Sequence, residues 1–211
     1  MSKFSADSLL LYAVTDRTWL KGRTMEEQVE EALMGGATCI QLREKALDRT
    51  AFIEEARSIK RLCERYEVPL IINDDAELAH LVGADGVHVG QKDMSPVTAR
   101  ELLGENKIIG VSARTVKQAL KAQEEGADYL GVGAVFGTST KADAQAISRE
   151  TLQEICRAVS IPVVAIGGIG ENNIFRLSGT GIAGAAVVSA IFASDNIKEA
   201  SRRLREQALK L

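Results

Sequence analysis

A regular alternation of two kinds of segment along the whole chain constrains its fold most strongly. Short runs of mostly aliphatic residues predict eight strands, at Leu9–Thr15, Thr38–Arg43, Pro69–Asn73, Gly86–Gly90, Lys107–Ser112, Tyr129–Val135, Pro162–Ile169 and Gly184–Ile191. Amphipathic stretches after each strand predict eight helices, at Met25–Met34, Ala51–Tyr66, Ala76–Leu81, Pro96–Leu103, Val116–Glu125, Arg149–Val159, Asn172–Leu177 and Ile197–Leu209. Because each strand is a nearly continuous apolar run, the pattern indicates a parallel sheet covered by helices.

A weak internal repeat supports this interpretation. Related tripeptides precede every second strand, as Gly36-Ala37-Thr38, Gly83-Ala84-Asp85, Gly126-Ala127-Asp128 and Gly181-Ile182-Ala183. Eight strand–helix units within 211 residues favour one α/β domain over residues 1–211, folded as a single (β/α)8 TIM barrel. An open, doubly wound sheet is the alternative.

Composition excludes several classes of function. The 26 basic and 29 acidic residues are interspersed and give a net charge of −3, which argues against a nucleic-acid-binding protein. Three widely spaced cysteines form no disulfide or zinc pattern and indicate reduced thiols in a cytoplasmic protein. We expect neither a membrane span nor a signal peptide. The sequence leaves the oligomeric state open, a homo-oligomer included.

Polar residues follow the predicted strands at their carboxyl ends, where TIM barrels carry their active sites. After the second strand come Gln41-Leu42-Arg43-Glu44-Lys45. The alternation of Gln41, Arg43 and Lys45 places them on one side of the strand, where two cations suit a polyanion. The alternative is a solvated basic strand end in which Glu44 pairs with the cations.

Two carboxylates end neighbouring strands. Asp74 follows the third strand and Asp93 the fourth. Mg²⁺ usually takes one or two carboxylates and completes its octahedron with water and substrate phosphate, so a metal site facing Arg43, Lys45 and Lys141 is predicted. The alternatives are that Asp75 replaces Asp74 as ligand, or that Asp75 and Asp93 only cap the helices that follow.

Small residues after the last strands fit a phosphate. Gly167-Gly168 and the run ending at Ser189 lie where TIM barrels often bind phosphate groups, unless the glycines only form tight turns. The mouth would then accept two anionic substrates. His88 lies within a strand, so we expect it in the core or behind the site rather than in a catalytic role.

Taken in order, these segments resemble the thiamine phosphate synthase family from Leu11 to about Ala193. The segments that carry the resemblance are Leu11-Tyr12-Ala13-Val14-Thr15-Asp16, Gln41 to Lys45, Asn73-Asp74-Asp75, Gly83 to Gln91 with Asp93, Gly110-Val111-Ser112, Thr138-Ser139-Thr140-Lys141, Ala165 to Ile169, and Val188-Ser189. The resemblance implies a transferase of thiamine biosynthesis that joins hydroxymethylpyrimidine diphosphate to a thiazole phosphate, carboxylated or not. Thiamine phosphate and pyrophosphate are its products, and the substrates are small molecules.

The resemblance also implies roles for residues. Gln41, Leu42, Arg43, Glu44, Lys45, Asn73 and Lys141 match the pyrimidine diphosphate site, and Asp74 and Asp93 match its Mg²⁺ ligands. Ser112 matches a residue near the pyrimidine. Thr138, Ser139, Thr140, Gly168, Val188 and Ser189 match the thiazole phosphate site. We expect Arg43, Lys45, Ser112 and Lys141 to be catalytic.

The chain departs from its relatives at Ala134 and Gly137, where they often carry proline, so the segment before Thr138 has fewer backbone restraints. Two other functions are weighed beside the synthase. A thiazole tautomerase of the same fold would need no diphosphate site, and a non-catalytic barrel could bind a phosphorylated metabolite. The presence of Asp74, Asp93 and Lys141 favours the synthase.

Overall fold

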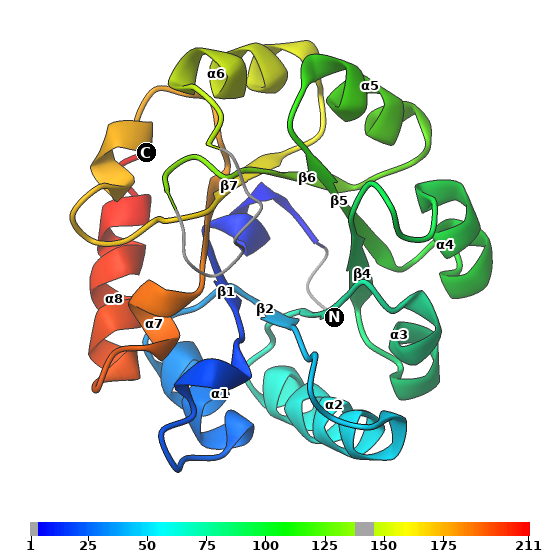
Figure 1. Ribbon diagram of the computed structural model, residues 1–211, viewed down its shortest axis with the longest axis vertical. Coiled ribbons are helices and arrows are strands. Elements are labelled where there is room, and N and C mark those ends of the chain that lie inside the picture. The colour runs from blue at the N-terminus through cyan, green and yellow to red at the C-terminus, as the bar shows by residue number, and fades with distance from the viewer. Residues whose placement is uncertain (1–3, 138–145) are drawn as a thin grey trace.

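A computed structural model of the protein describes residues 4–137 and 146–211. Eight parallel strands pair in sequence order, and β8 closes the sheet on β1, which excludes the open sheet and confirms the TIM barrel. Figure 1 looks along the barrel and shows the helices as an outer ring around the strands. The short segment before β1 lies across the ring in this view, at the end where the strands begin.

The elements follow the predicted order with shorter strands. The strands are β1 (Leu11–Val14), β2 (Cys39–Leu42), β3 (Leu70–Asn73), β4 (Gly86–Val89), β5 (Ile108–Ala113), β6 (Tyr129–Gly133), β7 (Val163–Ile166) and β8 (Gly184–Val187). The helices are α1 (Met25–Met34), α2 (Arg49–Arg65), α3 (Ala76–Val82), α4 (Pro96–Leu103), α5 (Val116–Glu124), α6 (Arg149–Ala158), α7 (Ser189–Phe192) and α8 (Ile197–Ala208). Three 3-10 helices join them, η1 (Ala6–Leu9), η2 (Arg17–Trp19) and η3 (Ile174–Leu177).

Two predicted elements differ from the structure near the end of the chain. The predicted strand at 184–191 stops at Val187, and its last apolar residues begin α7, where Ile191 is fully buried. The predicted helix at 172–177 is the single 3-10 turn η3. Hydrophobicity alone could not separate a strand from the buried short helix that follows it.

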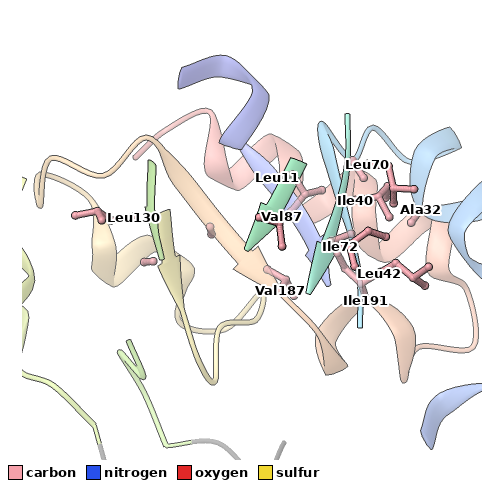
Figure 2. Close-up of a cluster of buried hydrophobic side chains, with 14 of the residues drawn as sticks. Leu11, Ala32, Ile40, Leu42, Leu70, Ile72, Val87, Leu130, Val187 and Ile191 are labelled. Carbon is pink, nitrogen blue, oxygen red and sulfur yellow. The ribbon is translucent and has the colours of Figure 1, made fainter. Parts of the chain in front are cut away.

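Side chains alternate between two buried layers along each strand. In β2, Ile40 and Leu42 face the helices, whereas Cys39 and Gln41 face the barrel interior. Figure 2 shows Leu42 among the aliphatic side chains of the outer layer. The interior layer therefore decides which residues reach the mouth of the barrel.

The repeated tripeptides close the opposite end of the barrel. Gly36, Gly83 and Gly126 all adopt positive φ angles as they lead from helix to strand. In the first three repeats the side chain of the third residue then accepts a hydrogen bond from a backbone N–H at the start of the preceding strand. The acceptor–donor pairs are Thr38 with Leu11 at 2.9 Å, Asp85 with Leu70 at 2.8 Å, and Asp128 with Ile109 at 2.7 Å. The repeat thus stabilises the face away from the predicted site.

No helix within the described ranges is both long and apolar enough to cross a membrane.

Candidate active site

Polar side chains face the barrel interior at the carboxyl ends of adjacent strands. Gln41 is the residue before the last of β2, Asn73 ends β3, His88 lies in β4 and Ser112 in β5. The register pairs Asn73 with His88 across the β3–β4 ladder, which places these side chains at similar depth. The structure thus brings together the predicted residues from four consecutive strands.

Leu42 differs from its neighbours in this group. Its side chain is completely buried between the barrel and the helices, so only its backbone can face a ligand. Arg43 and Lys45 also depart from the prediction, because β2 ends at Leu42 and strand alternation cannot place them on one side. They lie instead on a turn at the mouth.

Arg43 is held at the mouth by an acidic partner from the loop after β1. Its guanidinium lies 3.2 Å from the carboxylate of Asp16, and about a fifth of its side chain is exposed, at 22%. Its backbone N–H donates to the Thr15 hydroxyl at 3.0 Å. These contacts fix the residue while the planar guanidinium has five donors, enough to bind an anion as well.

Glu44 holds the turn rather than the cations. Its side chain is 1% exposed, and one carboxylate oxygen accepts the N–H groups of Lys45 at 2.7 Å and Leu47 at 3.2 Å. The other oxygen accepts from Arg17, which also binds Glu55. Burial opposes ionisation, but the hydrogen bonds from the turn and from Arg17 prevail and lower the pKa of Glu44. The alternative in which Glu44 pairs with the side chains of Arg43 and Lys45 therefore does not describe this residue, whose carboxylate instead anchors the turn.

Asp74 and Asp93 form the acidic part of the mouth. Desolvation and then the charge of the nearby Asp93 carboxylate raise the pKa of Asp74, while Lys45 acts in the opposite direction. Asp74 has a positive φ of 65°, an uncommon conformation for a residue with a side chain. When two carboxylates lie this close, the negative charge of one disfavours ionisation of the other unless a cation lies between them.

The structure separates the two capping alternatives. Asp75 is the N-cap of α3 and accepts from the Leu78 N–H at 2.7 Å. Ser95, not Asp93, caps α4. The Asp93 carboxylate instead accepts from the Gly90 N–H at 2.7 Å and closes the turn after β4.

Ser112 belongs to a buried hydrogen-bonded chain. Its hydroxyl lies 2.9 Å from Nε2 of His88, and Nδ1 of His88 lies 3.0 Å from the Tyr129 hydroxyl. Tyr129 contacts the hydroxyl of Tyr12 at 2.8 Å, and Tyr12 accepts from the Gln41 amide at 2.8 Å. His88 therefore lies behind the predicted site, as the sequence indicated.

Small residues after β7 and β8 form the other side of the mouth. A Cβ on Gly168 would lie 2.3 Å from the carbonyl oxygen of Gly137, so a side chain would displace the segment that leads to residue 138. A Cβ on Gly170 would lie 3.4 Å from that of Ala190, so the loop after β7 lies close to α7. Val188 and Ser189 begin α7 at this point and are partly exposed. Thr138, Ser139, Thr140 and Lys141 lie outside the described residues.

Comparison with known proteins identifies the family. The sequence model of the family described as "Thiamine monophosphate synthase" matches residues 11–191. The chain belongs to the thiamine monophosphate synthase family.

Relatives within this family cover nearly the whole chain. The chain is 52% identical over 194 residues to the thiamine-phosphate synthase of Clostridium tetani, covering 92% of this chain and 93% of the relative. The corresponding protein of Ruminiclostridium cellulolyticum is 52% identical over 196 residues and covers 93% of each. The thiamine phosphate pyrophosphorylase structure from Pyrococcus furiosus superimposes with a TM-score of 0.89 at 40% identity, over 97% of both chains.

Sequence reasoning missed some members of the site in this family member. Asp16 and Arg17 lie just after β1. They hold the Arg43–Lys45 turn in place through ion pairs, Asp16 with Arg43 and Arg17 with Glu44. Tyr12 and Tyr129 connect Gln41 to Ser112 through the barrel interior. A phenol on an interior strand position was the available signal, since a buried tyrosine hydroxyl needs a partner.

Proposed function

We propose that this protein is a thiamine-phosphate synthase. It joins 4-amino-2-methyl-5-hydroxymethylpyrimidine diphosphate to a thiazole phosphate and releases pyrophosphate, with loss of CO₂ where the thiazole carries a carboxylate. Family membership across residues 11–191 carries the proposal. The convergence of the matching residues at the carboxyl ends of the strands supports it.

The diphosphate is assigned to the side of the mouth formed by β2 and β3. Arg43 and Lys45 neutralise its oxygens, with Asp16 and Glu44 holding the turn in place. Asn73 contributes its amide group from the end of β3, and Gln41 is assigned to the pyrimidine of the same substrate. Lys141, outside the described residues, is assigned to the same diphosphate.

Mg²⁺ is assigned to Asp74 and Asp93. The donor set fits, because the Asp93 carboxylate helps to raise the pKa of Asp74, and a cation between the two carboxylates would offset that repulsion. Two carboxylates leave room for water and phosphate oxygens in an octahedral shell. Bound there, the ion supplies positive charge to the leaving pyrophosphate.

The thiazole phosphate is assigned to the opposite side. Gly168, Val188 and Ser189 offer backbone and hydroxyl groups where the loop after β7 lies close to the start of α7. Thr138, Ser139 and Thr140 would complete this site. The separation of two anion sites leaves the pyrimidine between them.

The reaction is assigned as dissociative. The methylene C–O bond breaks first, and pyrophosphate leaves with the bonding electrons. The pyrimidine ring and its amino group stabilise the resulting cation, and the thiazole nitrogen then supplies the electron pair of the new C–N bond. Arg43, Lys45 and Lys141 stabilise the charge that develops on the leaving group, so the step needs no strong general base.

A thermal-shift experiment separates this function from its two alternatives. Pyrophosphate alone and Mg²⁺ alone should raise the melting temperature little, and both together should raise it strongly, because tight binding stabilises the folded state. A thiazole tautomerase or a barrel that binds one phosphorylated metabolite requires no such synergy. Additive shifts would contradict the proposal.

Two further expectations accompany the function. We place residues 1–211 in one domain, in keeping with the closure of β8 on β1. The expectation of a cytoplasmic protein rests on Cys39, Cys63 and Cys156, which are unpaired.

A further inference from the structure

Five side chains form a continuous hydrogen-bonded chain through the barrel interior, from β2 to β5. Gln41 donates through its amide nitrogen to the Tyr12 oxygen, and the chain continues through Tyr129 and His88 to Ser112. Its four donor–acceptor distances lie between 2.8 and 3.0 Å. The two tyrosines are at most 1% exposed and His88 is 8% exposed.

The neighbouring strands leave space for this chain. A Cβ on Gly110 would lie 2.1 Å from Cζ of Tyr129, and a Cβ on Gly131 would lie 2.8 Å from Cε1 of His88. Any larger residue at these two positions would displace the rings. Tyr12 and Tyr129 also pack edge to face, with 5.9 Å between ring centroids.

The chemistry of the donors gives the chain one direction. The Gln41 amide nitrogen can only donate, so the Tyr12 oxygen accepts and its proton goes to Tyr129. Burial raises the pKa of both phenols well above its usual value, so each keeps its proton. The Tyr129 oxygen already accepts from Tyr12, so its own proton is left for Nδ1 of His88; in that tautomer Nε2 carries the ring proton and donates to Ser112.

We propose that Tyr12 and Tyr129 are positioning residues that set this direction, so that Gln41 keeps its carbonyl oxygen and Ser112 keeps its hydroxyl proton for the substrate. An aminopyrimidine offers a complementary amino donor and ring-nitrogen acceptors. Both polar groups would be oriented before the substrate arrives, which lowers the cost of stabilising the cation. The inference rests on the proposed function, in which Ser112 contacts the pyrimidine.

Nitrogen NMR of the wild-type protein tests the direction without any change to the chain. The protein has two histidines, and a His80→Gln variant identifies the His88 signals after labelling with ¹⁵N-histidine. We expect an unprotonated Nδ1 and a protonated Nε2 in His88. Protonation on Nδ1 instead would reverse the chain and overturn the proposal.

Kinetics test whether the chain acts through Ser112. Tyr129→Phe should lower kcat about 10-fold, on the scale of one lost hydrogen bond, and leave the KM for the thiazole phosphate unchanged. Ser112→Ala with Tyr129→Phe should be no slower than Ser112→Ala alone, because both changes remove the same contact. Tyr66→Phe is the matched control; its hydroxyl donates to Glu30 on the helical surface at 3.4 Å, and its kcat should equal that of the wild type.

The outcomes distinguish this inference from the function on which it rests. A lowered melting temperature with unchanged kcat in Tyr129→Phe, or independent losses that add in the double variant, would make the phenols merely structural and overturn the proposal. Loss of kcat in Tyr129→Phe but not in Ser112→Ala would also overturn it, while the synthase function would stand. A wild-type protein that forms no thiamine phosphate contradicts the function itself, whatever the His88 tautomer.

Discussion

Replacing Asp93 separates its two roles in the structure. Its carboxylate closes a turn through the Gly90 N–H at 2.7 Å, and its charge faces Asp74. Asp93→Asn keeps an oxygen that can accept the hydrogen bond but removes the charge. Asp93→Ala removes both, so Asp93→Asn against the wild type isolates the charge, and Asp93→Ala against Asp93→Asn isolates the hydrogen bond.

The two variants should lose activity equally and differ in stability. Each should lower kcat/KM at least about 100-fold, the usual cost of one well-placed electrostatic group, or about 2.7 kcal/mol. Asp93→Ala should also lose about 1 kcal/mol of stability with the Gly90 hydrogen bond, which corresponds to about 2–4 °C in melting temperature for a chain of this size. Asp93→Asn should melt no lower than the wild type at neutral pH.

The raised pKa of Asp74 determines how the stability of the folded protein changes with pH. Its pKa is raised in the folded protein, so the folded state binds more protons than the unfolded chain and stability falls as pH rises through that range. Because the Asp93 charge helps to raise the pKa of Asp74, Asp93→Asn should lose less stability than the wild type as the pH rises. The melting temperatures of Asp93→Asn and the wild type should therefore converge as the pH falls well below 3.8, the ordinary pKa of this carboxyl, because Asp74 then becomes protonated in both the folded and the unfolded state.

Steady-state kinetics over a Mg²⁺ titration, with melting curves from pH 3 to 8, measure these effects. Near wild-type activity and an unchanged Mg²⁺ response in Asp93→Asn would refute the metal assignment. Asp93 would then serve only to close the turn at Gly90.

Three further predictions concern other parts of the molecule. Lys141→Ala should lower kcat and weaken pyrophosphate binding more than thiazole phosphate binding. Calorimetry that shows a larger loss for the thiazole phosphate would contradict two separate anion sites. Ser112→Ala should lower kcat about 10- to 100-fold while pyrophosphate and Mg²⁺ binding stay nearly intact, which single-turnover rates and a melting curve on one preparation would check. Asp128→Ala should lower stability by about 1–3 kcal/mol in urea unfolding, because the Ile109 N–H at 2.7 Å loses its acceptor. Its kcat should not change, since Asp128 lies at the end of the barrel away from the mouth; a large fall would contradict that separation.

The sequence predicted the barrel because local pattern and global fold agree in this chain. Each strand is a nearly continuous apolar run, and a capping box of Thr24 and Glu27 starts α1. The glycine tripeptides marked every second strand, and the hydrogen bonds of Asp85 and Asp128 explain their period. The lengths of the strands were less predictable; at β8, for example, apolar residues continue past the end of the strand into α7.

The site was predictable in its residues and less so in their contacts. The strand ends placed Gln41, Asn73 and Ser112 together, because neighbouring parallel strands end at one edge. Pairing between distant segments had no local signal. The partners of Glu44 and Arg43 come from the loop after β1, and α2 adds Glu55, so they could be known only from the folded chain.

Formation of the product by the pure protein tests the central claim most directly. The protein is incubated with the pyrimidine diphosphate, the thiazole phosphate and Mg²⁺, and thiamine phosphate and pyrophosphate are quantified by mass spectrometry and phosphate release. We predict equal amounts of the two products and little product without Mg²⁺. Binding of both substrates with no thiamine phosphate over many hours would contradict the account.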